Sequence, residues 1–167
     1  MFYDTNTESL LDVVLARQIG MRETTYSSPL ATHGHTKESI EVNGQSVRDF
    51  PRLKHGGVHL KEPDREWAHD VILRAVLGVL AGVVAAALMT WLAALLLSRV
   101  HGGVASALRD IAADRTTYPV RAMLATLLVL SLLGGVVIAL MGHYHVLGTD
   151  RTGNDVLVQA LKSVRTA

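Results

Sequence analysis

Two long runs of apolar residues dominate the pattern of the chain. Residues 75–98 and 122–142 contain no Asp, Glu, Lys or Arg over 24 and 21 residues. As α-helices they would extend roughly 36 and 31 Å, and the apolar core of a bilayer is about 30 Å thick. The sequence therefore predicts two transmembrane helices, at 73–99 and 119–142, rather than the buried helices of a soluble protein.

Polar residues divide the rest of the chain into a polar extramembrane segment, a short loop, and a turn with an amphipathic helix: residues 1–72, 100–118 and 143–167. We predict an all-α membrane protein with two transmembrane helices and amphipathic surface helices. The alternating residues 40–47 around Asn43-Gly44 add a small β-hairpin in the N-terminal segment, because Asn-Gly favours a type I′ turn.

The N-terminal segment also predicts a short amphipathic helix at about 7–19. Thr5 and Glu8 have the spacing of a capping box, apolar residues follow at helical spacing, and Gly20 is a suitable stop. Such a helix suits either a membrane surface or a neighbouring element.

Small side chains recur every four residues in both apolar runs. Lipid provides no hydrophobic driving force between helices, so close backbone approach through small residues is a main source of their association. We predict helix-packing faces at Gly78, Gly82, Ala86, Thr90, Ala94 and Ser98 in the first run, and at Ser131, Gly135 and Ala139 in the second.

The charge of the chain is unevenly distributed. The net charge of +1 combines −3 over residues 1–72 with +4 over residues 73–167. Four arginines lie between the two apolar runs, which favours a cytoplasmic loop and places both terminal segments outside. The chain has no polybasic tract to favour nucleic-acid binding, and the absence of Cys excludes disulfides and thiol chemistry.

A turn and a helix start follow the second run. Thr152 and Asp155 have capping-box spacing, and Asp155 suits the positive end of a helix dipole. An amphipathic helix along the membrane surface fits the apolar face that follows: Val156, Leu157, Ala160, Leu161 and Val164.

The same segment resembles the one that opens the core of ABC importer permeases of the dipeptide, oligopeptide and nickel group. The pattern there is H-P-L-G-T-D-x-x-G-R-D-V-L, followed by a short helix ending in G-x-R. The matching positions are His145, Leu147, Gly148, Thr149, Asp150, Gly153, Asp155, Val156, Leu157 and Arg165. Val146, Asn154 and Ser163 depart from it, replacing Pro, Arg and Gly.

This resemblance implies a multi-pass protein of the bacterial inner membrane that takes part in peptide uptake. Its partners would be the lipid bilayer, a second permease subunit, two ATP-binding subunits and a soluble substrate-binding protein. The motif would lie on the external face, in agreement with the topology from charge. The core helices and the E-A-A coupling loop would follow Ala167, so we expect the N-terminal part of a permease, with packing and channel-mouth roles.

Two other functions fit the same pattern. The first is a small accessory or assembly protein that packs on a larger membrane complex. The second is a metal-sensing membrane domain, because histidines are paired at 33 and 35, 55 and 59, and 143 and 145. No third ligand is fixed by spacing, so we assign no metal site and expect no cofactor.

We expect no catalysis by the chain itself. The sequence contains neither a P-loop nor a G-x-S-x-G nucleophile elbow. Neither apolar run carries an ionisable residue in its middle, as a proton or ion relay would need.

Overall fold

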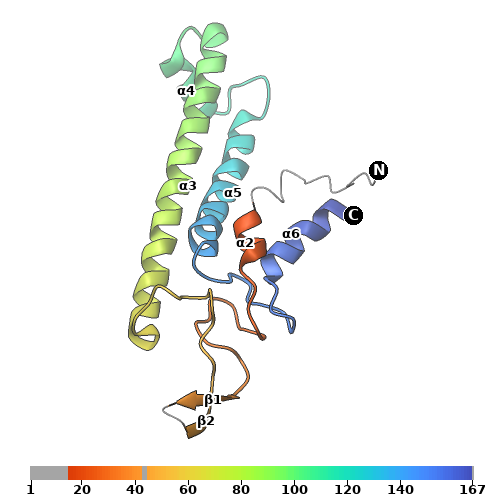
Figure 1. Ribbon diagram of the computed structural model, residues 1–167. Coiled ribbons are helices and arrows are strands. Elements are labelled where there is room, and N and C mark those ends of the chain that lie inside the picture. Colours follow the sequence, from red (N-terminus) through yellow and green to blue (C-terminus); the bar gives the residue numbers. More distant parts are fainter. Residues whose placement is uncertain (1–14, 43–44, 167) are drawn as a thin grey trace, which may run out of the picture. The chain divides into compact units, whose positions relative to one another are not determined.

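A computed structural model describes residues 15–42 and 45–166 and is mostly helical with one small antiparallel sheet (Figure 1). The helices are α2 (Ala16–Gly20), α3 (Pro63–His101), α4 (Val104–Ala112), α5 (Val120–Met141) and α6 (Val156–Thr166), and the strands are β1 (Glu38–Val42) and β2 (Gln45–Asp49). The chain divides into two compact units. Unit 1 is Met1–Asp70 with Leu140–Ala167, and unit 2 is Val71–Ala139.

Both apolar runs form helices that are long and apolar enough to cross a membrane. α5 has 22 residues and matches the predicted bounds to within one residue at each end. α3 has 39 residues and contains the whole predicted span 73–99. The predicted architecture of two such helices with further helices and a small hairpin is therefore confirmed.

α3 begins ten residues before the predicted span, inside the polar segment 1–72. Pro63 fits the first turn, because that position has no intrahelical use for an N–H group. The carboxylate of Glu66 accepts hydrogen bonds from the backbone N–H groups of Lys61 and Glu62, at 3.0 and 3.3 Å. The three prolines in residues 1–72 favour loop structure, so the sequence did not predict that the helix would begin before residue 73.

The predicted loop 100–118 is not a plain loop, because it contains α4. Gly102 and Gly103 have φ values of 73° and 138°, which separate α4 from the end of α3. Ala107 and Ile111, one turn apart, are buried in a cluster with Ala94 of α3. The loop therefore folds back onto the small-residue face of the long helix.

Within unit 2, the small-residue series of α3 lies against the other helices of the same chain. A Cβ added to Gly78 would lie 2.5 Å from the carbonyl oxygen of Gly135, and one added to Gly82 would lie equally close to that of Ser131. Only glycine permits this approach of the α3 and α5 backbones. The other predicted packing positions also lie in these helices, with Ala86 and Ala94 buried, Thr90 bonded to the carbonyl of Ala86, and Ala139 beside the contact.

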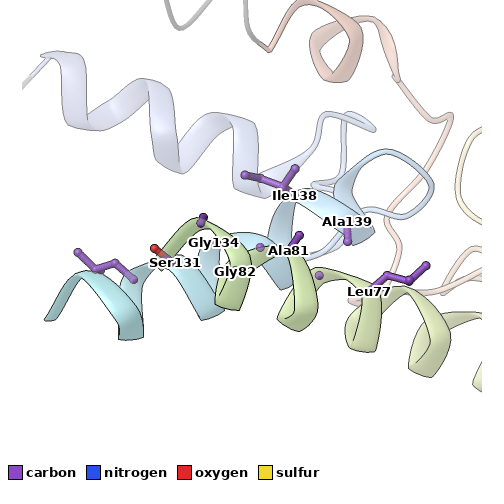
Figure 2. A pocket seen from close by; sticks show the side chains of 11 residues that line it. Leu77, Ala81, Gly82, Ser131, Gly134, Ile138 and Ala139 are labelled. Carbon is purple, nitrogen blue, oxygen red and sulfur yellow. The ribbon is translucent and has the colours of Figure 1, made fainter. Parts of the chain in front are cut away.

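An open apolar groove of ≈ 640 Å³ runs beside this contact (Figure 2). Leu77 and Ala81 line it from α3, and Gly134 and Ile138 line it from α5. A Cβ at Gly134 would meet nothing within 4 Å, in contrast to the glycines of the contact itself.

The Asn-Gly hairpin is present in unit 1. β1 and β2 pair antiparallel with Val42 opposite Gln45, and residues 43–44, for which the type I′ turn is predicted, lie outside the described part. The N–H of Gly34 donates to the carbonyl of Pro51 at 2.8 Å, so antiparallel pairing continues toward the body of the unit. This continuation supplies the support that an isolated two-stranded hairpin lacks.

Most of the predicted N-terminal helix, including Thr5 and Glu8, lies outside the described residues. Its described end is α2, which stops at Gly20 as predicted. Leu15, immediately before α2, is buried and anchors this end of the segment.

Gly78→Ala is expected to destabilise unit 2 by about 1–3 kcal/mol, the usual cost of overpacking. The new Cβ would force α3 and α5 apart. Gly134→Ala is the matched control, and it should be neutral or slightly stabilising because alanine favours helix. The measurement is unfolding of the purified chain in detergent micelles by titration with SDS, followed by circular dichroism. Equal stability of the two variants would contradict the close contact.

Candidate functional site

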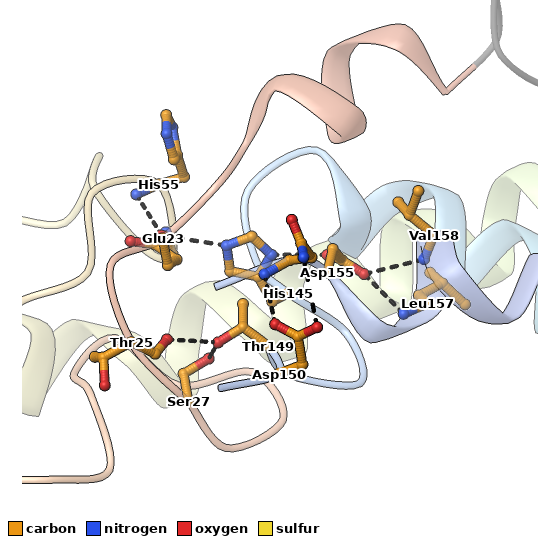
Figure 3. A network of polar contacts seen from close by, with 12 residues as sticks. Glu23, Thr25, Ser27, His55, His145, Thr149, Asp150, Asp155, Leu157 and Val158 are labelled. Atoms are coloured by element: carbon orange, nitrogen blue, oxygen red, sulfur yellow. Dashed lines mark hydrogen bonds and ion pairs between the residues drawn. The ribbon is translucent and has the colours of Figure 1, made fainter. Parts of the chain in front are cut away.

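The segment that carries the family resemblance folds as a tight turn leading into α6 (Figure 3). One carboxylate oxygen of Asp150 accepts hydrogen bonds from the backbone N–H groups of Thr152 and Asn154, at 2.8 and 2.9 Å. Hydrogen bonds from the side chains of Thr152 and Gln159 and from the backbone of Asn154 hold the pKa of Asp150 well below its usual range. Asp150 is therefore the ionised centre of the turn.

Asp155 caps α6 directly. Its Oδ1 accepts hydrogen bonds from the backbone N–H groups of Leu157 and Val158, at 2.8 and 3.2 Å. The sequence predicted a capping box with Thr152 at the cap, and that detail is wrong. The hydroxyl of Thr152 donates to Asp150 at 2.7 Å instead, so the helix begins three residues later than the box implied.

His145 lies between two carboxylates in the interior of unit 1. Its Nδ1 is 2.7 Å from Oδ2 of Asp155, and its Nε2 is 3.1 Å from Oε1 of Glu23. The three side chains are only 2%, 7% and 1% exposed, respectively. Burial alone would lower the pKa of His145, but the hydrogen bonds with Asp155 and Glu23 outweigh it and raise the pKa to about 9. The ring is therefore an imidazolium at neutral pH.

Glu23 joins this ion network to a distant loop. Its Oε1 accepts hydrogen bonds from the backbone N–H groups of His55 and Gly56, at 2.7 and 3.1 Å, and its Oε2 accepts one from Lys54 at 2.7 Å. Burial would raise the pKa of Glu23, but the bond from His145 and these backbone donors lower it to about 2. One carboxylate thus holds three separate stretches of the chain together.

Thr149 forms a second link between the turn and the N-terminal segment. It is fully buried, and its hydroxyl lies 2.9 Å from the carbonyl of Thr25 and 3.0 Å from the hydroxyl of Ser27. Its N–H donates to the carbonyl of Ser27 at 3.2 Å. Backbone and side chain of one residue therefore both fasten the turn to residues 25–27.

The two motif glycines are required by the same contact. Gly148 and Gly153 have φ values of 75° and 79°, which other residues rarely adopt. A Cβ on Gly148 would collide with the carbonyl oxygen of Ser27, and one on Gly153 with that of Glu23. The N-terminal segment thus passes directly against the backbone of the turn.

This arrangement suits a structural role for His145. A general base needs an unprotonated ring nitrogen within reach of its substrate. Both nitrogens here face carboxylates, and the ring is buried. What the network does is hold the terminal segments of the chain together.

The histidine pairs considered as metal ligands have separate partners. His59 Nε2 lies 2.9 Å from Oδ2 of Asp70, with the ring of His143 edge-on at 5.0 Å. His35 stands edge-on to Tyr26. Among the residues that the structure describes, no three His, Asp or Glu side chains are arranged to hold a metal ion.

The N–H of Val156, another motif position, donates to the carbonyl of Gly148 at 3.1 Å. Leu147 is 47% exposed, and Arg165 lies in α6 with its side chain outside the described part. Sequence reasoning missed Glu23 and Ser27, the partners of the motif. Each is 122 residues from the residue that it contacts, and no local spacing rule connects positions so far apart.

Comparisons of the chain with protein-family models, with curated proteins and with solved structures found no match. The function therefore has to be argued from the residues and the geometry. The relevant features are the two apolar helices and the ion network that orders the motif.

Glu23→Gln is expected to destabilise unit 1 by about 3–5 kcal/mol, the usual cost of removing one partner from a buried ion pair. Glutamine keeps the size of the side chain but leaves the His145 charge with one carboxylate. The control is Glu62→Gln, because Glu62 pairs with Arg65 on the exposed surface at 3.3 Å and should cost less than about 1 kcal/mol. Thermal unfolding of the full chain in micelles measures both. Similar losses would exclude a special role for the buried network.

The stability of unit 1 is expected to fall at both high and low pH. The pKa of His145 is raised from 6.5 to about 9, so its contribution is complete below pH 6.5 and is lost as the pH rises through 9. The pKa of Glu23 is lowered from 4.5 to about 2, so its contribution is complete above pH 4.5 and is lost toward pH 2. Unfolding measured from pH 6.5 to 9 should show a decline in the native chain that His145→Gln lacks. An identical decline in both proteins would contradict the assignment.

Proposed function

We propose that the chain is a non-catalytic, membrane-embedded component of a bacterial inner-membrane transporter. The observation that carries the membrane part is the exposure of its two apolar helices. Only 17% and 6% of their most apolar stretches are buried within the chain, and large side chains such as Leu80, Leu88 and Leu130 are more than half exposed. Water would disfavour so much apolar surface, whereas the interior of a bilayer suits it.

We further propose that the transporter is an ABC importer for peptides, of which the chain forms the N-terminal part of one permease subunit. The support is the resemblance of residues 145–165, together with the structural roles that these residues have in the turn. His145, Gly148, Thr149 and Asp155 all shape the turn or fasten it to other segments. The chain would pack against a second permease subunit and contribute to the external mouth. The energy would come from two ATP-binding subunits, and a soluble binding protein would deliver the peptide.

The alternative is an accessory protein that packs on a larger membrane complex. One observation favours it: within unit 2 the small-residue series of α3 is covered by α5 and α4 of the same chain. A helical hairpin that satisfies its own packing face needs no partner helix to complete it. Peptide transport then has no part in its function.

The topology of the chain provides the first test. The chain lacks Cys, so single cysteines at Ser46, Thr117 and Ser163 report on separate sites. Ser46 and Ser163 belong to unit 1 and Thr117 to unit 2, and all three are exposed. An impermeant maleimide added to intact cells should label the first two positions and reach Thr117 only after permeabilisation. Labelling of all three in intact cells would contradict two membrane spans, and labelling of Thr117 alone would contradict the permease orientation.

The composition of the native complex distinguishes the importer from the accessory protein. The tagged chain is purified from its own membranes in mild detergent. A permease subunit and ABC ATP-binding subunits in stoichiometric amounts support the importer. A different membrane complex without ATP-binding subunits supports the alternative and overturns the permease proposal.

A further inference from the structure

A cavity of ≈ 750 Å³ lies in unit 1, beside the turn that leads into α6. Tyr26 and His35 line it from the N-terminal part of the unit, and Asp150, Arg151 and Val156 line it from the turn and the start of α6. A volume of roughly 300–1,000 Å³ is typical of sites that bind small organic molecules. The buried ion network does not account for this space, since none of its three side chains lines the cavity.

Contacts within unit 1 hold the walls of the cavity in place. The N–H of His35 donates to the carbonyl of Tyr26 at 2.9 Å, and the two rings stand edge-on with their centroids 5.3 Å apart. Thr149, which also lines the cavity, bonds to the carbonyl of Thr25 at 2.9 Å (Figure 3). A ligand would therefore meet walls that already have their shape, which lowers the entropy cost of binding.

The polar side chains that remain available in the cavity are able to donate hydrogen bonds. In the described part of the chain, the guanidinium of Arg151, the hydroxyl of Tyr26 and Nε2 of His35 form no hydrogen bond. Asp150 is the acid among the described lining residues, and its two oxygens already accept hydrogen bonds from the turn and from α6. The cavity therefore suits a ligand that is rich in acceptor atoms.

The cavity also offers aromatic and apolar surface. Tyr26 is 41% exposed, so part of its ring is open to a ligand. The ring of His35 stands beside it, and Val156 adds an aliphatic side chain to the lining. Aromatic rings gain most from a flat partner that stacks on a face or meets an edge. A ligand of matching chemistry would carry a flat apolar body next to its acceptor group.

We propose that this cavity binds a small organic anion, a carboxylate attached to a flat apolar body. The guanidinium of Arg151 pairs with the carboxylate, for which its planar fork of donors is suited. The rings of Tyr26 and His35 contact the apolar body. Residue 151 is one of the two positions that the permease pattern leaves open, so the site is not part of the resemblance. The inference does not depend on transport, because every residue that it uses belongs to unit 1.

The test measures binding of para-fluorobenzoate to the full chain in phosphatidylcholine nanodiscs by fluorine NMR, with empty nanodiscs as the blank. The neutral para-fluorobenzamide and the cationic para-fluorobenzylamine have nearly the same shape. The benzoate should bind saturably and about tenfold more tightly than either of the others, the usual effect of hydrogen bonds to a charged group.

Three variants assign the binding to this cavity. Arg151→Gln should weaken binding of the benzoate about tenfold and leave the benzamide unchanged, whereas Tyr26→Leu should weaken both. Arg48→Gln is the matched control, because it removes the same charge from an exposed residue of β2 outside the cavity. It should change neither probe. The side chain of Arg151 is exposed and makes no hydrogen bond in the described part, so its variant should unfold at the native temperature.

Three results would overturn the proposal. The first is the absence of saturable binding of the benzoate, or equal binding of the three probes. The second is tighter binding of the benzylamine, because the carboxylate of Asp150 would then set the charge preference. The third is binding of the benzoate that Arg151→Gln leaves unchanged, which would place the anion elsewhere on the chain.

Discussion

The buried imidazolium of His145 is the interaction on which unit 1 depends. It requires two carboxylates, and the chain supplies them from positions far apart, Glu23 near the start and Asp155 at the cap of α6. An unpaired charge of this kind would be strongly unfavourable in a protein interior. The segment around Glu23 and the segment after α5 are therefore expected to fold together.

Glycine has a different physical role in each unit. In unit 2, Gly78 and Gly82 have ordinary helical backbones, and the absence of a side chain lets α5 approach. In unit 1, Gly148 and Gly153 adopt positive φ as well as accepting a close neighbour. The first role follows from a periodicity of four along an apolar run and is visible in the sequence. The second depends on where residues 23–29 pass, so the sequence shows only that glycines are present.

The elements that were predicted correctly depend on neighbours in sequence. The two apolar helices follow from uninterrupted runs, the hairpin from Asn43-Gly44, and the presence of α6, although not its first residue, from the change to an amphipathic pattern. The details that were missed depend on contacts across the fold. α4 forms because Ala107 and Ile111 find Ala94 in a different helix. The sequence around Glu23 contains no motif that predicts its role. The structure shows that role, because the carboxylate accepts hydrogen bonds from three backbone N–H groups and contacts the ring of His145.

Two departures from the permease pattern, Asn154 and Ser163, form hydrogen bonds within the turn and within α6. Asn154 replaces an arginine, and its side-chain amide donates to the hydroxyl of Thr152 at 2.7 Å, inside the turn. Ser163 replaces a glycine on an exposed part of α6 and bonds to its own helix. His145, Gly148 and Thr149 match the pattern. Each is buried and in contact with the N-terminal segment, so this fold would not tolerate a substitution there. The matching residues therefore shape the turn that connects the end of α5 to the start of α6. For this reason we propose a structural role for the segment rather than contact with a transported substrate.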